Sequence, residues 1–245
     1  MQLALLPTLF LLWEWAARTG RIDAFIMSSP SRVAATLLRL LQSGELWHHL
    51  LASALETAAG FLLGTLLGGL LAAALWWWPM LAKVCEPYLV VLGALPKTAL
   101  GPIFIVWMGA GRGAIIAMTL AISLIVTVME VYNGFLATEE GKLRLLRTLG
   151  ATRRQLLWQL VLPANLPTLV SALKVNVGLS WVGVIMGEFL VSREGLGYLI
   201  VYGSQVFQMD LVMATVFLLA AAAALMYEGV LLLEKALKKY LGVSV

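Results

Sequence analysis

Long runs of apolar residues are the feature that most constrains how this chain can fold. Hydrophobic residues make up 61% of its 245 residues and charged residues only 12%, and the apolar residues are gathered into runs instead of alternating with polar ones. A helix of about 20 residues spans the hydrocarbon layer of a bilayer. The sequence therefore predicts an all-α, polytopic helical membrane protein with a single transmembrane domain over residues 1–245.

The runs predict about six transmembrane helices, with both chain ends on the same side of the membrane. They cover residues 3–17, 50–78, 87–107, 113–132, 166–191 and 211–233. The first run is short for a crossing. The third contains Pro96 and Pro102 with Lys97 between them, which predicts a broken helix. With six crossings, nine Lys and Arg residues lie on the same side of the membrane as residues 138–155, and six lie on the other side. This difference favours a cytoplasmic location for that segment and for both termini.

Two local patterns predict how helices pack and lie. In the second run, four glycines at helical spacing favour close approach of a neighbouring helix: Gly60, Gly64, Gly68 and Gly69. After Pro30, apolar residues at helical spacing follow a serine-rich loop, which predicts a short amphipathic helix on the membrane surface.

The chain offers no chemistry typical of an enzyme or a metalloprotein. Cys85 is the one cysteine, and His48 and His49 have no second ligand pair nearby, so we expect no metal site. There is no G-x-x-x-x-G-K-[ST] motif, which excludes a nucleotide site of that type. A net charge of +4 gives no indication of nucleic-acid binding.

A charged segment, residues 138–155, reads as a helix, a glycine corner and a second helix. Thr138 is the expected cap of the first helix, whose first turn carries two glutamates. Gly150 is expected to end that helix in the left-handed conformation. Thr152 and Gln155 have the spacing of a capping box for the second helix.

Two arginines, Arg153 and Arg154, occupy the first turn of the second helix. There, each positive charge opposes the helix dipole by about 0.3–1 kcal/mol. Anionic lipid headgroups or an acidic protein surface would each compensate for this cost. The residues alone leave both explanations open.

The segment around Gly150 resembles the cytoplasmic signature of the membrane subunits of bacterial ABC importers. In that signature a glycine is followed ten residues later by an aliphatic residue and then by Leu-Pro. Here Gly150 is followed by Leu160 and then by Leu162 and Pro163. The family signature begins with Glu-Ala-Ala, whereas this chain has Arg-Leu-Leu at 144–146. The resemblance extends from about residue 30 onward. The chain resembles in particular the branch of the family that serves nitrate, taurine, aliphatic sulfonates and pyrimidine or vitamin precursors.

The resemblance implies a type I ABC importer permease fold and a place in a larger assembly in the bacterial inner membrane. Two copies of the chain would form a homodimer on two separate ATPase subunits, which bind ATP and Mg, and an extracytoplasmic binding protein would deliver the solute. This chain itself would bind no cofactor. The coupling loop would cover about residues 136–165, with these residues docking the ATPase: Leu143, Arg147, Leu149, Gly150, Ala151, Thr152, Arg153, Arg154, Leu162 and Pro163.

Polar residues within the apolar runs are candidates for the translocation path, because they are costly in a membrane unless paired or functional. These candidates are Lys97, Asn176, Ser180, Trp181, Met186 and Glu188. Glu188 has an alternative role as an acceptor for the backbone of residues 195–197, and Lys97 has one as a snorkelling side chain. We also predict an ion pair between Glu130 and Lys174 that holds two crossings together.

The alternative function is an ion-coupled secondary carrier or channel that works without an ATPase. Such proteins are expected to carry two broken helices in corresponding halves of an inverted repeat. This chain has one broken run and no evident partner for it.

Overall fold

The computed structural model describes residues 2–241, and every regular element in them is helical. The elements are α1 (Gln2–Arg18), α2 (Ala24–Met27), α3 (Pro30–Ser43), α4 (Glu45–Trp77), α5 (Pro79–Ala94), η1 (Lys97–Leu100), α6 (Gly101–Met108), α7 (Arg112–Leu136), α8 (Glu140–Thr148), α9 (Arg153–Leu156), η2 (Leu157–Val161), α10 (Leu162–Ala164), α11 (Leu166–Val191), α12 (Leu196–Gln205) and α13 (Met209–Leu241).

Four helices are long and apolar enough to cross a membrane: α4, α7, α11 and α13. The predicted broken crossing is also present, since α5 and the following η1–α6 segment form an apolar pair bent by 91°. The described residues thus contain up to five candidate crossings. The first predicted crossing, residues 3–17, corresponds to α1, which at 17 residues is shorter than these four helices. Its crossing stays a prediction.

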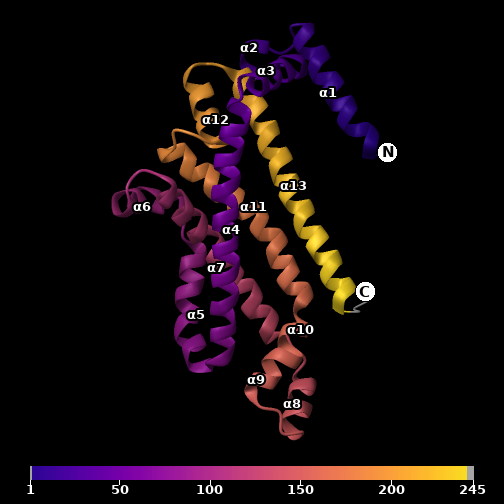
Figure 1. Ribbon diagram of the computed structural model, residues 1–245, viewed down its shortest axis with the longest axis vertical. Helices are drawn as coiled ribbons and strands as arrows, with labels where there is room; N and C mark the ends of the chain where they lie inside the picture. The colour runs from indigo at the N-terminus through magenta and orange to yellow at the C-terminus, as the bar shows by residue number, and fades with distance from the viewer. Residues whose placement is uncertain (1, 242–245) are drawn as a thin grey trace.

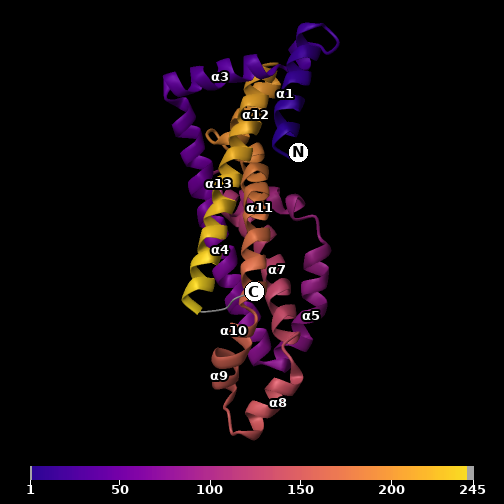
Figure 2. The ribbon, with the colours of Figure 1, turned by 90° about the vertical axis from the view of Figure 1, so that its right-hand side faces the viewer.

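Helices α4, α7 and α11 form the centre of the bundle (Figures 1 and 2). Three of the four predicted glycines face α7, where their missing side chains let threonine and serine residues pack directly against the α4 backbone. Gly60 meets Thr119, Gly64 meets Ser123 and Gly68 meets Thr127. The fourth, Gly69, has no neighbouring atom within 4 Å. The close approach predicted for this run is therefore confirmed at three positions.

The predicted amphipathic helix is α3, which lies across the upper ends of the long helices (Figures 1 and 2). The Ser29 side chain caps its first turn, and Gly44 ends it in the left-handed conformation, with φ of 81°. The Arg32 guanidinium lies 2.9 Å from the Asp210 carboxylate, which ties α3 to the start of α13. The segment from α8 to α10, here called the Gly150 loop (residues 136–165), extends from the opposite end (Figure 1).

Candidate functional site

The corner of the Gly150 loop has the geometry that the sequence predicts. Gly150 has φ of 83°, in the left-handed region. Its amide donates to the Arg147 carbonyl at 3.0 Å, and the Ala151 amide donates to the Leu146 carbonyl at 2.9 Å. This pair of bonds is the Schellman motif, which satisfies the last carbonyls of α8. Space does not require glycine here, because a Cβ would meet no atom within 4 Å, so the requirement comes from φ alone.

The second helix begins with the predicted capping box. The Thr152 side chain accepts from the Gln155 amide, and the Gln155 side chain accepts from the Thr152 amide at 2.8 Å. The helix then widens into a π-turn, η2, before Pro163. Turns of this kind are rare and occur frequently at functional sites. This turn was not predicted from the sequence, because π-turns lack a residue signature as specific as the capping box.

The prediction that Thr138 caps the first helix is wrong. The helix begins at Glu140, and the cap position is Glu139. The Thr138 hydroxyl instead accepts a hydrogen bond from the Asn165 side chain at 2.8 Å. This bond ties the two ends of the Gly150 loop together, which is a tertiary contact across 27 residues that local capping rules cannot anticipate.

The two arginines that oppose their own helix dipole differ in their surroundings. The Arg153 guanidinium donates to the Trp76 carbonyl at 3.2 Å and lies 5.6 Å from the centre of the Trp76 ring. It therefore sits at the negative end of α4, which compensates for its position in α9. Arg154 and Arg147 form no ion pair or side-chain hydrogen bond with any described residue, whereas Arg144 pairs with Glu140 at 2.6 Å.

Large apolar side chains are exposed around the corner. Leu149 is exposed by 74%, Leu145 by 61% and Trp158 by 64%. Leu143 and Leu162, two of the predicted docking residues, are instead half-buried against the cluster of Val131, Phe135 and Val161 with other core residues. Of the other predicted docking residues, Ala151 is half-buried and the rest are exposed: Arg147, Leu149, Gly150, Thr152, Arg153, Arg154 and Pro163.

Four of the predicted path residues are buried within the subunit. The Asn176 side chain donates to the hydroxyls of Thr65 and Thr127 at 3.0 and 2.6 Å, and so joins α11 to α4 and α7. Ser180 and Trp181 are also buried, with Trp181 packed among apolar side chains of α11, α12 and α13. These three side chains are therefore packed within the subunit.

Glu188, the fourth, takes the alternative role considered from the sequence. Its carboxylate accepts from the Gly197 amide and from the Ser53 hydroxyl. The Leu196 amide donates to Ser53, and the Gly195 amide donates to His49 Nδ1 at 3.1 Å. Side chains of α4 and α11 thus satisfy the first amides of α12, which have no partner within their own helix.

The sequence did not identify Ser53 and His49 as members of this cluster. A serine and a histidine four residues apart share a helix face, but their partners are backbone amides 143 and 146 residues away. Nearby, the Arg112 guanidinium lies 2.6 Å from Glu194 and 3.6 Å from the buried Glu56. The described residues contain no group of side chains arranged to hold a metal ion.

The two remaining path candidates are more accessible. Met186 lies on the outer face of α11 with 37% of its surface exposed. Met186 belongs to a row of exposed residues along α11. The row consists of Val175, Gly178, Val182, Met186 and Phe189. Lys97 bends back, and its ammonium group donates to the Gly93 carbonyl at 2.6 Å, at the end of α5.

The predicted Glu130–Lys174 ion pair is wrong. The Lys174 ammonium lies 2.7 Å from the Glu234 carboxylate of α13. Glu130 faces Ser171 instead. Ser171 and Lys174 are less than one turn apart on α11 but face different helices. The prediction rested on the depth of Glu130 and Lys174 in the membrane, and depth alone does not show which neighbouring helix a side chain faces. The ion pair therefore joins α11 to α13.

Comparisons with known proteins agree with this architecture. Residues 60–240 match the family described as the binding-protein-dependent transport system inner membrane component. A probable ABC transporter permease protein of Haemophilus influenzae is 31% identical over 93% of this chain and 92% of its own length. The formylaminopyrimidine transport permease protein of Halalkalibacterium halodurans is 31% identical over 96% of this chain and 95% of its own.

The fold also has a counterpart among solved structures. A chain of the methionine ABC transporter MetNI in an inward-facing conformation superposes with a TM-score of 0.63, over 80% of this chain and 95% of that one, at 22% identity. This likeness shows the fold, which is that of a type I importer permease. The family match also decides between an ABC permease and a carrier that works alone. The chain belongs to the binding-protein-dependent inner membrane components, the transport subunits of ABC importers, which leave ATP hydrolysis to separate subunits.

Proposed function

We propose that the Gly150 loop docks a separate ATPase subunit, which binds ATP and Mg, and that this contact drives import of a small solute. The observation that carries the proposal is the exposed corner itself. Leu145, Leu149 and Trp158 present apolar surface, and Arg147 and Arg154 stand beside them without ion-pair partners among the described residues. An apolar centre with unpaired charges at its edge is typical of a protein interface.

The charges favour an acidic surface on the ATPase. Because Arg153 is already satisfied by the end of α4, the docking role falls on Arg147 and Arg154. Lipid headgroups are a weaker explanation for the corner, since the loop extends beyond the ends of the long helices (Figures 1 and 2). We also propose that the Gly150 loop and both termini lie in the cytoplasm, which for the N-terminus requires that α1 crosses the membrane.

Copurification tests the docking proposal. The chain would be coexpressed with ATPase subunits from its own genome, as the native sequence and as the Arg147→Glu/Arg154→Glu variant. We expect the variant to lose at least about tenfold of the bound ATPase, because two charge-assisted contacts become repulsive. Arg193→Glu is the matched control, since Arg193 is exposed in the outer turn between α11 and α12. Equal recovery of the ATPase with both variants would disprove docking at this corner.

We further propose that two copies of the chain meet along the exposed row of α11 and enclose the path between them, where a binding protein delivers the solute. The burial of the other path candidates on α11 supports this arrangement, because they pack against their own subunit. Met186 is exposed and therefore open to a partner or a solute. The solute of the pyrimidine relative is a small polar molecule, and we propose cargo of that class.

Disulfide cross-linking tests the paired arrangement. In a Cys85→Ala background, Val182→Cys is expected to form a covalent dimer in membranes under mild oxidation. Leu225→Cys on α13, exposed by 74%, is the control and is expected to stay monomeric. Dimer formation at Leu225 but not at Val182 would place the partner on another face.

A further inference from the structure

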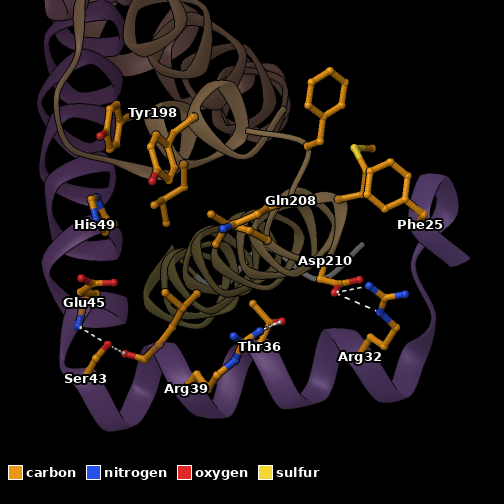
Figure 3. A pocket seen from close by; sticks show the side chains of 16 residues that line it. Phe25, Arg32, Thr36, Arg39, Ser43, Glu45, His49, Tyr198, Gln208 and Asp210 are labelled. Carbon is orange, nitrogen blue, oxygen red and sulfur yellow. Dashed lines mark hydrogen bonds and ion pairs between the residues drawn. The ribbon is translucent and has the colours of Figure 1, made fainter. Parts of the chain in front are cut away.

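A polar pocket of about 740 Å³ is seen from close by in Figure 3. The helices that line it lie at the end of the bundle farthest from the Gly150 loop (Figure 1). The pocket is lined by α2, α3, the first turns of α4, α12 and the start of α13, and it opens to the surface. Its volume falls in the range of small-molecule binding sites. Neither the Gly150 loop nor the exposed row of α11 contributes to it, so the docking and path proposals do not account for it.

Two of the four formal charges in the pocket wall have no partner. Arg32 and Asp210 neutralise each other at 2.9 Å. The Arg39 guanidinium donates only to the Thr36 hydroxyl, at 2.9 Å. The Glu45 carboxylate forms no hydrogen bond or ion pair with any described residue, and it is too far from Arg39 to pair with it. One unpaired positive and one unpaired negative group therefore line the same space (Figure 3).

A buried histidine adds a directed donor. His49 is only 8% exposed, and its Nδ1 accepts from the Gly195 amide, which places the ring proton of neutral His49 on Nε2. That N–H has no acceptor among the residues the structure describes, and the ring borders the pocket. Stacking on Tyr198, with ring centres 5.8 Å apart, fixes its direction. Because this N–H borders the pocket and is not sealed in the core, an occupant that carries oxygen can accept from it in place of solvent.

Backbone strain is concentrated at the same place. Within residues 2–241, two non-glycine residues have left-handed φ angles: Ser28 at 57° and Phe207 at 55°. Phe207 lines the pocket, and the Ser28 hydroxyl donates to Asp210 in its wall at 2.7 Å. Each such residue costs about 1–2 kcal/mol, and strain of this kind clusters at binding sites and switch regions.

We propose that this pocket binds a small zwitterion that carries an oxyanion and an ammonium group. The oxyanion accepts from Arg39 and His49, and the ammonium group pairs with Glu45. A ligand with a single charge would be attracted by one of the two unpaired groups and repelled by the other. The ethanolamine headgroup of a phospholipid and a free aminosulfonate or amino acid share this chemistry. The proposal does not depend on ATPase docking.

Two arms of one experiment separate the sources. In the first, taurine and ethanesulfonate, which differ only in the ammonium group, are titrated calorimetrically into the purified full chain in phosphatidylglycerol nanodiscs. In the second, native mass spectrometry measures which lipid the chain retains from an equimolar mixture of phosphatidylethanolamine and phosphatidylglycerol. Both arms use Arg39→Gln and Glu45→Gln, with Gln42→Ala on exposed α3 surface as control.

We expect a preference for the zwitterion of about tenfold in one arm or the other, as for one charge-assisted hydrogen bond. Glu45→Gln is expected to remove the preference and Glu45→Asp to restore part of it, while Arg39→Gln weakens every ligand. A preference in the first arm identifies a free solute, and one in the second arm identifies a lipid. No preference in either arm, or a preference that Glu45→Gln leaves unchanged or that Gln42→Ala also removes, would overturn the proposal.

Discussion

Replacing Gly68 by alanine tests whether the glycine row of α4 holds the bundle together. A Cβ at Gly68 would lie 2.7 Å from both Cβ and Cγ2 of Thr127 and 3.3 Å from the Leu124 carbonyl oxygen. Carbon atoms in ordinary contact are about 3.5 Å apart, so α4 and α7 would have to separate by about 0.8 Å. Thr127 cannot rotate away, because its hydroxyl donates to Ser123 at 2.9 Å and accepts from Asn176 at 2.6 Å.

Gly69→Ala is the matched control for Gly68→Ala. Both variants gain the same helix propensity, but a Cβ at Gly69 meets no atom within 4 Å. The difference between them therefore isolates overpacking, which we expect to cost about 1–3 kcal/mol. The measurement is the free energy of unfolding, obtained by titrating each variant in mixed micelles with a denaturing detergent. A difference below about 0.5 kcal/mol would refute the reasoning, because it would mean that the helices separate without loss.

Three further predictions concern other contacts. The Lys174→Glu/Glu234→Lys exchange should recover about 1 kcal/mol relative to the sum of the single changes, measured by a double-mutant cycle of unfolding free energies. Ser53→Ala should cost about 1–3 kcal/mol, because it leaves an α12 amide unpaired, whereas Ser204→Ala, whose hydroxyl bonds within its own turn, should cost little in the same titration. Gly150→Asn should retain the ATPase in copurification and Gly150→Val should lose it, because asparagine tolerates a left-handed φ and a β-branched residue does not.

The Gly150 loop could be predicted well because its signals are local. A left-handed glycine and a capping box depend on residues within three or four positions, and both have the predicted geometry. Thr138 was mispredicted because its partner, Asn165, lies on the far side of the loop. The same limit applies to Arg153, whose charge looks unfavourable within α9 but is satisfied by the Trp76 carbonyl of a distant helix.

The face of a crossing was harder to predict than its position. Composition placed α4, α7, α11 and α13 correctly, but an almost uniformly apolar helix carries little periodic signal to show which side is buried. The sequence therefore could not distinguish a path-lining role for Asn176 from the structural role it has, in which its side chain donates to Thr65 and Thr127. Likewise, the partner of Lys174 depended on which helix it faces.

These contacts also bear on how motion at the Gly150 loop would reach the rest of the subunit. Arg153 holds the loop to one end of α4, and Ser53, near the other end of that helix, holds the start of α12. Between them, the glycine row and the Asn176 bonds join α4 to α7 and α11. Close-packed helices transmit displacement better than they absorb it, so if an ATPase docks on the loop as we propose, we expect α4, α7 and α11 to move with it as one body. Gly68→Ala tests this as well: if it loosens the body, it should lower solute transport per ATP hydrolysed while leaving ATPase binding intact.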